Sequence, residues 1–131
     1  MDAYKTHGAF SWSELMTSDP EAALRFYREL FGWTTDTMPM PDGTYHVLKA
    51  DGTAIGGVMK LPKEAATGGM PPSWGCYVTV KDVDECARQV TALGGKVLHP
   101  PTDIPSVGRF AVVADPQGAW LSVITYAMPS K

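Results

Sequence analysis

The chain of 131 residues is 44% hydrophobic and carries 11 basic and 14 acidic residues, which gives a formal net charge of −3. This length suits one domain, or two small halves that share a core. The mild acidity and the absence of a Lys/Arg-rich cluster argue against a nucleic-acid-binding surface. No run of about 18 apolar residues predicts a membrane span, and the first ten residues lack the pattern of a secretory signal, so we expect a cytoplasmic protein.

The first half of the chain has the pattern of a strand, a helix and three further strands. Residues 9–17 are strand-like, and Ser18 or Asp19 can cap the helix that follows. Pro20 suits the first helical position, and Gly32 can adopt the left-handed conformation that ends a helix. The apolar residues between them follow helical spacing and predict one buried face: Ala23, Phe26, Tyr27, Leu30 and Phe31. Strands are expected at 33–38, 44–50 and 54–61.

The second half repeats this order of elements. A strand is expected at 74–80, a helix capped by Asp82 and stopped by Gly94-Gly95, and strands at 96–101, 109–115 and 120–126. Leu30 and Gly32 recur as Leu93 and Gly95, both 63 positions later, and Ser11-Trp12 recurs as Ser73-Trp74. Repetition of both the order of elements and the residues that begin and end them indicates an internal duplication.

We therefore predict an α+β fold in which two tandem βαβββ modules form a curved mixed sheet around a central cleft. The first module is expected at 8–62, a Pro/Gly-rich linker at 63–72 and the second module at 73–127. A single helix covers only one face of its sheet, so each module would leave an apolar face for the other to shield. A cleft follows from that arrangement.

Two motifs resemble a known family. The pattern Asp-Pro-x-x-Ala…Phe-Tyr…Leu-Phe-Gly-Trp at 19–33 and the segment ADPQGAWLSVI at 114–124 are similar to those of the vicinal oxygen chelate superfamily. Its members include glyoxalase I, bleomycin-resistance proteins and extradiol dioxygenases. The resemblance covers nearly the whole chain, and it implies the paired βαβββ fold and a homodimer.

Metal-using members of that family bind a divalent ion through a His or Gln that begins the first strand of each module and a Glu late in its last strand. The matching positions here are Trp12, Gly56, Gly75 and Ser122. An indole offers only a donor, glycine has no side chain, and a neutral serine hydroxyl is a weak ligand. We therefore expect no metal ligands at these positions and no cofactor.

The residues that would line the cleft follow from strand alternation, because every second side chain shares a face. Such a cleft would be aromatic and mostly apolar, with one carboxylate and a few hydroxyls, which suits a small organic ligand. The predicted ligand-binding residues are Trp12, Glu14, Met16, His46, Tyr77, Trp120, Ser122 and Ile124.

The most specific functional hypothesis concerns Glu14. Its carboxylate could anchor a ligand or act as the catalytic general base, or it could be solvated at the cleft mouth or paired with an arginine such as Arg109. His46 could be a proton-transfer partner or a structural residue, and a metal held unconventionally by Glu14 and His46 is the alternative to a metal-free pocket. His99, which precedes Pro100-Pro101, is expected in a loop.

Two functions remain open at this point. The first is a glyoxalase/bleomycin-resistance-like protein that binds a small, partly aromatic organic molecule without a metal. The second is a lyase or isomerase of the glyoxalase type, or a dioxygenase, that uses an unconventional metal site or Glu14 as general base. A third possibility is an interaction module whose own side chains fill the cleft. The expected partners are a small organic molecule and a second copy of the chain, with no nucleic acid and no membrane.

Overall fold

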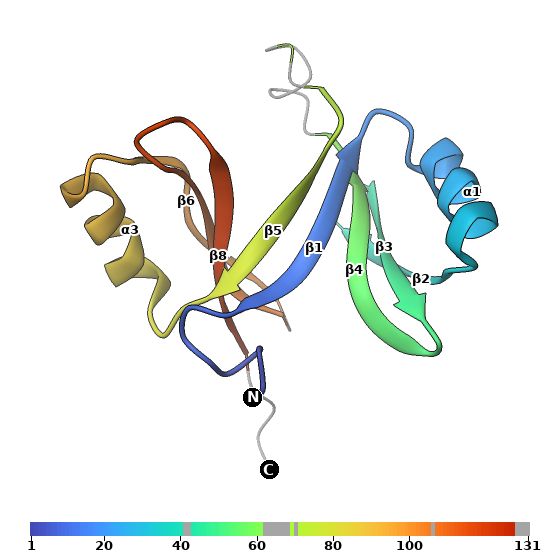
Figure 1. The fold of residues 1–131 in the computed structure, drawn as a ribbon, viewed down its shortest axis with the longest axis horizontal. Coiled ribbons are helices and arrows are strands. Elements are labelled where there is room, and N and C mark those ends of the chain that lie inside the picture. Colours follow the sequence, from blue (N-terminus) through green and yellow to red (C-terminus); the bar gives the residue numbers. More distant parts are fainter. Residues whose placement is uncertain (41–42, 62–68, 70, 106, 128–131) are drawn as a thin grey trace. The chain divides into compact units, whose positions relative to one another are not determined.

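The computed structural model describes residues 1–40, 43–61, 69, 71–105 and 107–127, and Figure 1 shows their fold. The chain divides into two compact units, a first unit of Ser13–Gly75 and a second unit that combines Met1–Trp12 with Cys76–Lys131. The first unit contains most of β1 (Phe10–Thr17), α1 (Pro20–Phe31), β2 (Thr34–Met40), β3 (Gly43–Ala50) and β4 (Thr53–Lys60). The second unit contains most of β5 (Ser73–Thr79), α3 (Val83–Ala92), β6 (Lys96–Ile104), β7 (Gly108–Ala114) and β8 (Trp120–Tyr126).

Both units have the same mixed topology. The hydrogen-bonded order is β2-β3-β4-β1 in the first unit and β5-β8-β7-β6 in the second. β1 pairs with β4 and β5 with β8 in parallel, whereas the remaining pairs are antiparallel. The predicted α+β class with two βαβββ modules is confirmed. The predicted linker lies largely outside the described residues, and the predicted module boundaries and cleft stay predictions.

The helix ends follow from local sequence. Asp19 accepts a hydrogen bond from the Ala22 backbone N–H at 3.1 Å, and Asp82 accepts one from Glu85 N–H at the same distance. These carboxylates satisfy helix-start donors that would otherwise have no partner within the helix. Gly32 ends α1 with a φ of 75°, a conformation that L side chains adopt only at a cost. Asp19, rather than Ser18, is therefore the cap of α1.

One face of each sheet is covered by its own helix. In the first unit, Leu24 of α1 packs on Leu15, Leu48 and Val58, and in the second unit, Val83 of α3 packs with Val80, Ala111 and Val123. Burial of these aliphatic side chains removes apolar area from water and holds each helix on its sheet.

The face of α1 that the sequence predicted to be buried is only partly buried. Ala23 and Tyr27 pack against the core, but Phe26, Leu30 and Phe31 are exposed. The prediction of core positions for these three residues is wrong, because the sheet contacts a narrower strip of the helix than its apolar residues occupy.

No helix in the described part of the chain is long and apolar enough to cross a membrane.

Candidate functional site

The helix-free face of the first unit carries a buried carboxylate. Glu14 pairs with Gly57 of β4, and Gly57 pairs with Val47 of β3, so these positions share one face of the sheet. The neighbouring residues in the same strands, Leu15 and Val58, lie in the core beneath α1. Glu14 therefore lies on the face away from α1, where it is 9% exposed.

Tyr45 reaches Glu14 across the intervening strand. Its hydroxyl donates a hydrogen bond to Glu14 Oε1 at 2.9 Å, and its ring passes over Gly57. A Cβ at position 57 would overlap the Tyr45 ring and hydroxyl oxygen, so only glycine permits this contact. The sequence did not single out Tyr45. The sequence contained one signal for Tyr45. By strand alternation Tyr45 shares a face with Val47, and the neighbouring strand contains the glycine pair Gly56-Gly57, which leaves room for a ring.

Met16 and His46 lie on opposite faces of the same sheet. Met16 pairs with Met59 and, by alternation, shares the helix-free face with Glu14. His46 pairs with Val58, and its Nε2 lies 3.8 Å from Oε2 of Glu21 on α1. His46 is thus buried on the α1 side. The structure does not bring Glu14 and His46 together, which removes the basis for a joint metal site.

The second unit presents its own helix-free face. Tyr77 pairs with Ser122, and Thr79 with Ile124, whereas the intervening residue Val123 lies in the core beneath α3. Tyr77 and Ile124 are buried, Ser122 is half-buried and Trp120 is exposed. Alternation along β8 places Trp120, Ser122 and Ile124 on one face, and alternation along β1 places half-buried Trp12 on the face of Glu14.

His99 and Phe110 add an aromatic pair to the helix-free face of the second unit. Their rings stack with centroids 5.2 Å apart and planes 14° apart. His99 lies in β6 opposite Val112, in agreement with the strand expected at 96–101, so the separate assignment of His99 to a loop is wrong. The Thr102 hydroxyl donates to Pro100 O at 2.9 Å and lies 3.1 Å from His99 Nε2. Because the Thr102 hydroxyl already donates its proton to Pro100 O, it can only accept a hydrogen bond from His99, so Nε2 must carry the donated proton. Nδ1 of a neutral His99 is then an acceptor.

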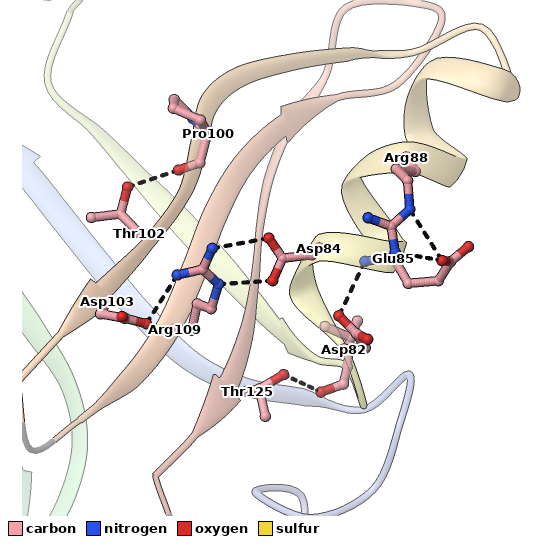
Figure 2. Close-up of polar contacts among 10 residues, drawn as sticks. Asp82, Asp84, Glu85, Arg88, Pro100, Thr102, Asp103, Arg109 and Thr125 are labelled. Carbon is pink, nitrogen blue, oxygen red and sulfur yellow. Dashed lines mark hydrogen bonds and ion pairs between the residues drawn. The ribbon is translucent and has the colours of Figure 1, made fainter.

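Arg109 does not pair with Glu14. It holds Asp84 at the start of α3 through two hydrogen bonds of 2.9 Å and Asp103 of β6 through one of 3.1 Å (Figure 2). The Arg109 hydrogen bond lowers the pKa of Asp84, and the two carboxylates raise the pKa of Arg109. This cluster borders a depression of about 450 Å³ that also includes Lys81 and Tyr126. The sequence did not predict this depression.

The positions matched to the family's metal ligands carry Trp12, Gly56, Gly75 and Ser122. Register places Gly57, rather than Gly56, on the face of Glu14, which corrects the position matched to the family's ligand, but neither glycine has a side chain to bind a metal. Within residues 1–40, 43–61, 69, 71–105 and 107–127, no three His, Cys, Asp or Glu side chains are grouped so that they could hold one.

Comparison with protein families adds a sequence relationship to this geometry. The model of the Glyoxalase/Bleomycin resistance protein/Dioxygenase superfamily matches residues 9–123. A Mycobacterium bovis protein named "Putative glyoxylase CFP32" is 45% identical over 118 residues, which are 89% of this chain and 44% of that protein. The Streptomyces peucetius anthracycline biosynthesis protein DnrV is 35% identical over 127 residues, covering 88% of this chain and 46% of that protein. The chain thus spans less than half the length of these relatives.

Solved structures agree with the fold. Methylmalonyl-CoA epimerase from Mycobacterium tuberculosis aligns with a TM-score of 0.67 at 16% identity, over 92% of this chain and 89% of that one. The hypothetical protein BH1468 from Bacillus halodurans aligns with a TM-score of 0.73 at 10% identity, over 96% and 99% of the two chains. At such identities the likeness concerns the fold alone.

Proposed function

Because this chain belongs to the Glyoxalase/Bleomycin resistance protein/Dioxygenase superfamily, we propose that it binds a small, partly aromatic organic molecule without a metal ion. The ligand would contact the helix-free faces of the two modules, in the cleft predicted between them. A cytoplasmic location and a homodimer belong to the same proposal. The observation that carries it is the Glu14–Tyr45 pair, a buried carboxylate held by a phenol on a face that carries no helix.

The chemistry of this pair suits a ligand with a hydrogen-bond donor. A carboxylate has about four lone-pair sites, so Glu14 can accept from Tyr45 and from a ligand hydroxyl or ammonium group together. Met16 beside it supplies a polarizable apolar surface that favours aromatic rings. On the second module, Tyr77 and Ile124 supply apolar wall, and Nδ1 of His99 supplies an acceptor. These groups select a planar molecule with polar edges.

A fluorescent anthracycline is a suitable first probe, because a 35% identical relative is named for anthracycline biosynthesis. Doxorubicin has fused rings, hydroxyl groups and one ammonium group, and its fluorescence reports binding directly. We expect saturable binding that Glu14→Gln weakens about tenfold or more, since the neutral amide keeps the shape but loses the charge. Tyr45→Phe should weaken binding less, because the carboxylate remains.

Glu21→Gln is the matched control for this titration. Glu21 is a carboxylate of the same unit, but it lies on α1 beside His46, on the opposite face from Glu14. Its replacement should leave binding unchanged. Equal affinity of the Glu14→Gln variant and the natural protein, for doxorubicin and for a panel of smaller hydroxylated aromatics, would remove Glu14 from the site.

The second candidate function is proton transfer by Glu14, and the 45% identity to a protein named as a glyoxylase favours it. In that reaction Glu14 would take the C–H proton of the thiol adduct of a 2-oxoaldehyde, so that the C–H electrons form a carbon–carbon double bond and the carbonyl π electrons move to the carbonyl oxygen. Glu14 would then return the proton to the former carbonyl carbon, while the hydroxyl proton of the first carbon passes to the former carbonyl oxygen, which gives a 2-hydroxy thioester. Deuterium incorporation into the thiol adduct of a 2-oxoaldehyde in D₂O, followed by proton NMR, tests it. Incorporation that needs Glu14 would make this chain an enzyme; no incorporation above the buffer rate would leave the binding function alone.

A further inference from the structure

α1 has an apolar arc wider than the strip that its sheet buries. At about 100° per residue, the apolar side chains occupy roughly half the circumference of the helix. In order around the helix, this arc contains Leu24, Tyr27, Ala23, Leu30 and Phe26. Leu24 is fully buried, and Ala23 and Tyr27 pack against the core around it. Leu30 and Phe26 lie at the far end of the arc, and both side chains are exposed.

Four large side chains form an uncovered surface that we call the α1 patch: Phe26 (60% exposed), Leu30 (57%), Phe31 (56%) and Trp74 (42%). The three aromatic rings of the patch all contact Tyr27. The Phe26 ring lies edge-on to the Tyr27 ring with centroids 5.0 Å apart, and the Phe31 ring stacks on the Tyr27 ring with centroids 6.1 Å apart. Trp74 Nε1 donates a hydrogen bond to the Tyr27 hydroxyl at 3.1 Å. Rings that are already fixed lose little conformational entropy on association, as is typical of interface anchors.

We propose that the α1 patch is the contact surface between two copies of this chain, with α1 packed antiparallel to α1 about a two-fold axis. The inference rests on the homodimer of the proposed function and adds the face that forms it. With about 150–250 Å² for a whole aromatic side chain, the exposed fractions correspond to roughly 400 Å² of apolar surface. A stable dimer buries about 800 Å² per partner, of which about 65% is apolar in homodimers. The patch therefore supplies most of the apolar centre of such an interface.

The charges beside the α1 patch suit a second copy of the same helix. Arg25 and Glu29 lie one turn apart on the polar flank next to Phe26, and both are exposed. In an antiparallel two-fold pair, the same flank of each helix meets its counterpart in reverse order. Arg25 of each copy then lies next to Glu29 of the other, so the rim is self-complementary in charge. A strongly acidic or basic partner would find no such match.

Sedimentation velocity of the 131-residue chain over a range of concentrations tests the proposal. The natural sequence should sediment as a species of twice the 14.1 kDa chain mass. Leu30→Asp and Phe26→Asp should sediment as monomers with a near-native circular dichroism spectrum, because both residues are exposed. Leu93→Asp is the matched control. Leu93 occupies the repeat position of Leu30, caps α3 and is 78% exposed, so its replacement should leave the dimer intact.

A charge-swap cycle tests the antiparallel arrangement. Arg25→Glu or Glu29→Arg alone should raise the dissociation constant about tenfold, because like charges then meet at the rim. The double variant Arg25→Glu/Glu29→Arg should return to within about threefold of the natural value. Failure of the double variant to recover would overturn the antiparallel packing.

The outcomes separate this inference from the proposals on which it rests. A dimer that survives both Leu30→Asp and Phe26→Asp overturns the α1 patch as the interface and leaves the homodimer standing. A natural chain that is monomeric at every concentration overturns both. The doxorubicin titration of the Glu14 variant is read independently of either result, because Glu14 lies on the opposite face of the sheet from α1.

Discussion

The hydroxyl of Tyr45 on β3 lies 2.9 Å from Oε1 of Glu14 on β1, and the tyrosine ring spans β4 at Gly57 to reach it. An alanine at position 57 would place its Cβ inside the volume of that ring. We expect Gly57→Ala to displace Tyr45, to lower the free energy of unfolding by about 1–3 kcal/mol and to weaken ligand binding as Tyr45→Phe does. Urea unfolding and the doxorubicin titration measure the two effects.

Gly75→Ala is the control for this substitution. The nearest atom to a Cβ at position 75 is the Glu14 backbone oxygen at 4.0 Å, which is ordinary contact. Its unfolding free energy should change by less than about 0.5 kcal/mol. If the two variants were equally stable, the close packing of Tyr45 over Gly57 would be contradicted.

The position of Glu14 could be predicted from sequence because strand alternation has a period of two and needs only one reference residue on β1. The side of the sheet on which His46 lies could not, since it depends on how β3 pairs with β4, whose register shifts between Leu48 and Lys49. A one-residue change in register moves a side chain to the other face. His46 accordingly lies beneath α1, beside Glu21.

His99 and α1 show two further limits of sequence patterns. Pro100-Pro101 predicted a loop at His99, but β6 is an edge strand, where proline is tolerated, and its register shifts on both sides of His99. Helical spacing identified the apolar side of α1 correctly. It could not show how wide a strip the sheet covers, because that width depends on the neighbouring strands, and Phe26 and Leu30 remain exposed.

The ion pair of Arg109 with Asp84 predicts a pH-dependent contribution to stability. The hydrogen bonds from Arg109 lower the pKa of Asp84 in the folded state relative to about 3.9 for an unperturbed Asp. The ionised carboxylate therefore stabilises the fold above about pH 4, and this contribution is lost as the pH falls through the lowered pKa. Asp84→Asn should reduce the unfolding free energy at neutral pH. In acid, the unfolding free energies of the variant and the natural protein should become equal.

Asp103→Asn should have a smaller effect, because Asp103 accepts one hydrogen bond from Arg109 and Asp84 accepts two (Figure 2). Both differences should shrink in high salt, since these side chains are partly exposed and the interaction is screened. Urea unfolding at a series of pH values gives the comparison. A deficit of Asp84→Asn that is independent of pH would point to lost packing instead of a lost ion pair.

The hydrogen bonds of Thr102 predict the tautomer of His99. With its proton donated to Pro100 O, the hydroxyl can only accept from Nε2, so neutral His99 should carry its proton on Nε2. Long-range ¹H–¹⁵N correlation spectra above neutral pH distinguish the two ring nitrogens. Thr102→Val should reduce this preference while the stack on Phe110 remains. Observation of the Nδ1–H form in the natural protein would exclude the arrangement.

The duplicated helix caps predict matched losses of stability in the two modules. Asp19 and Asp82 each accept a backbone N–H hydrogen bond of 3.1 Å at the start of a helix. Replacement of either by alanine should cost about 1 kcal/mol in urea unfolding, because the freed donor has no other partner within the helix. Ser18→Ala is the control, since Asp19 occupies the cap position of α1. A loss at Ser18 equal to that at Asp19 would mean that the helix begins one residue earlier and that the two modules do not share the same start.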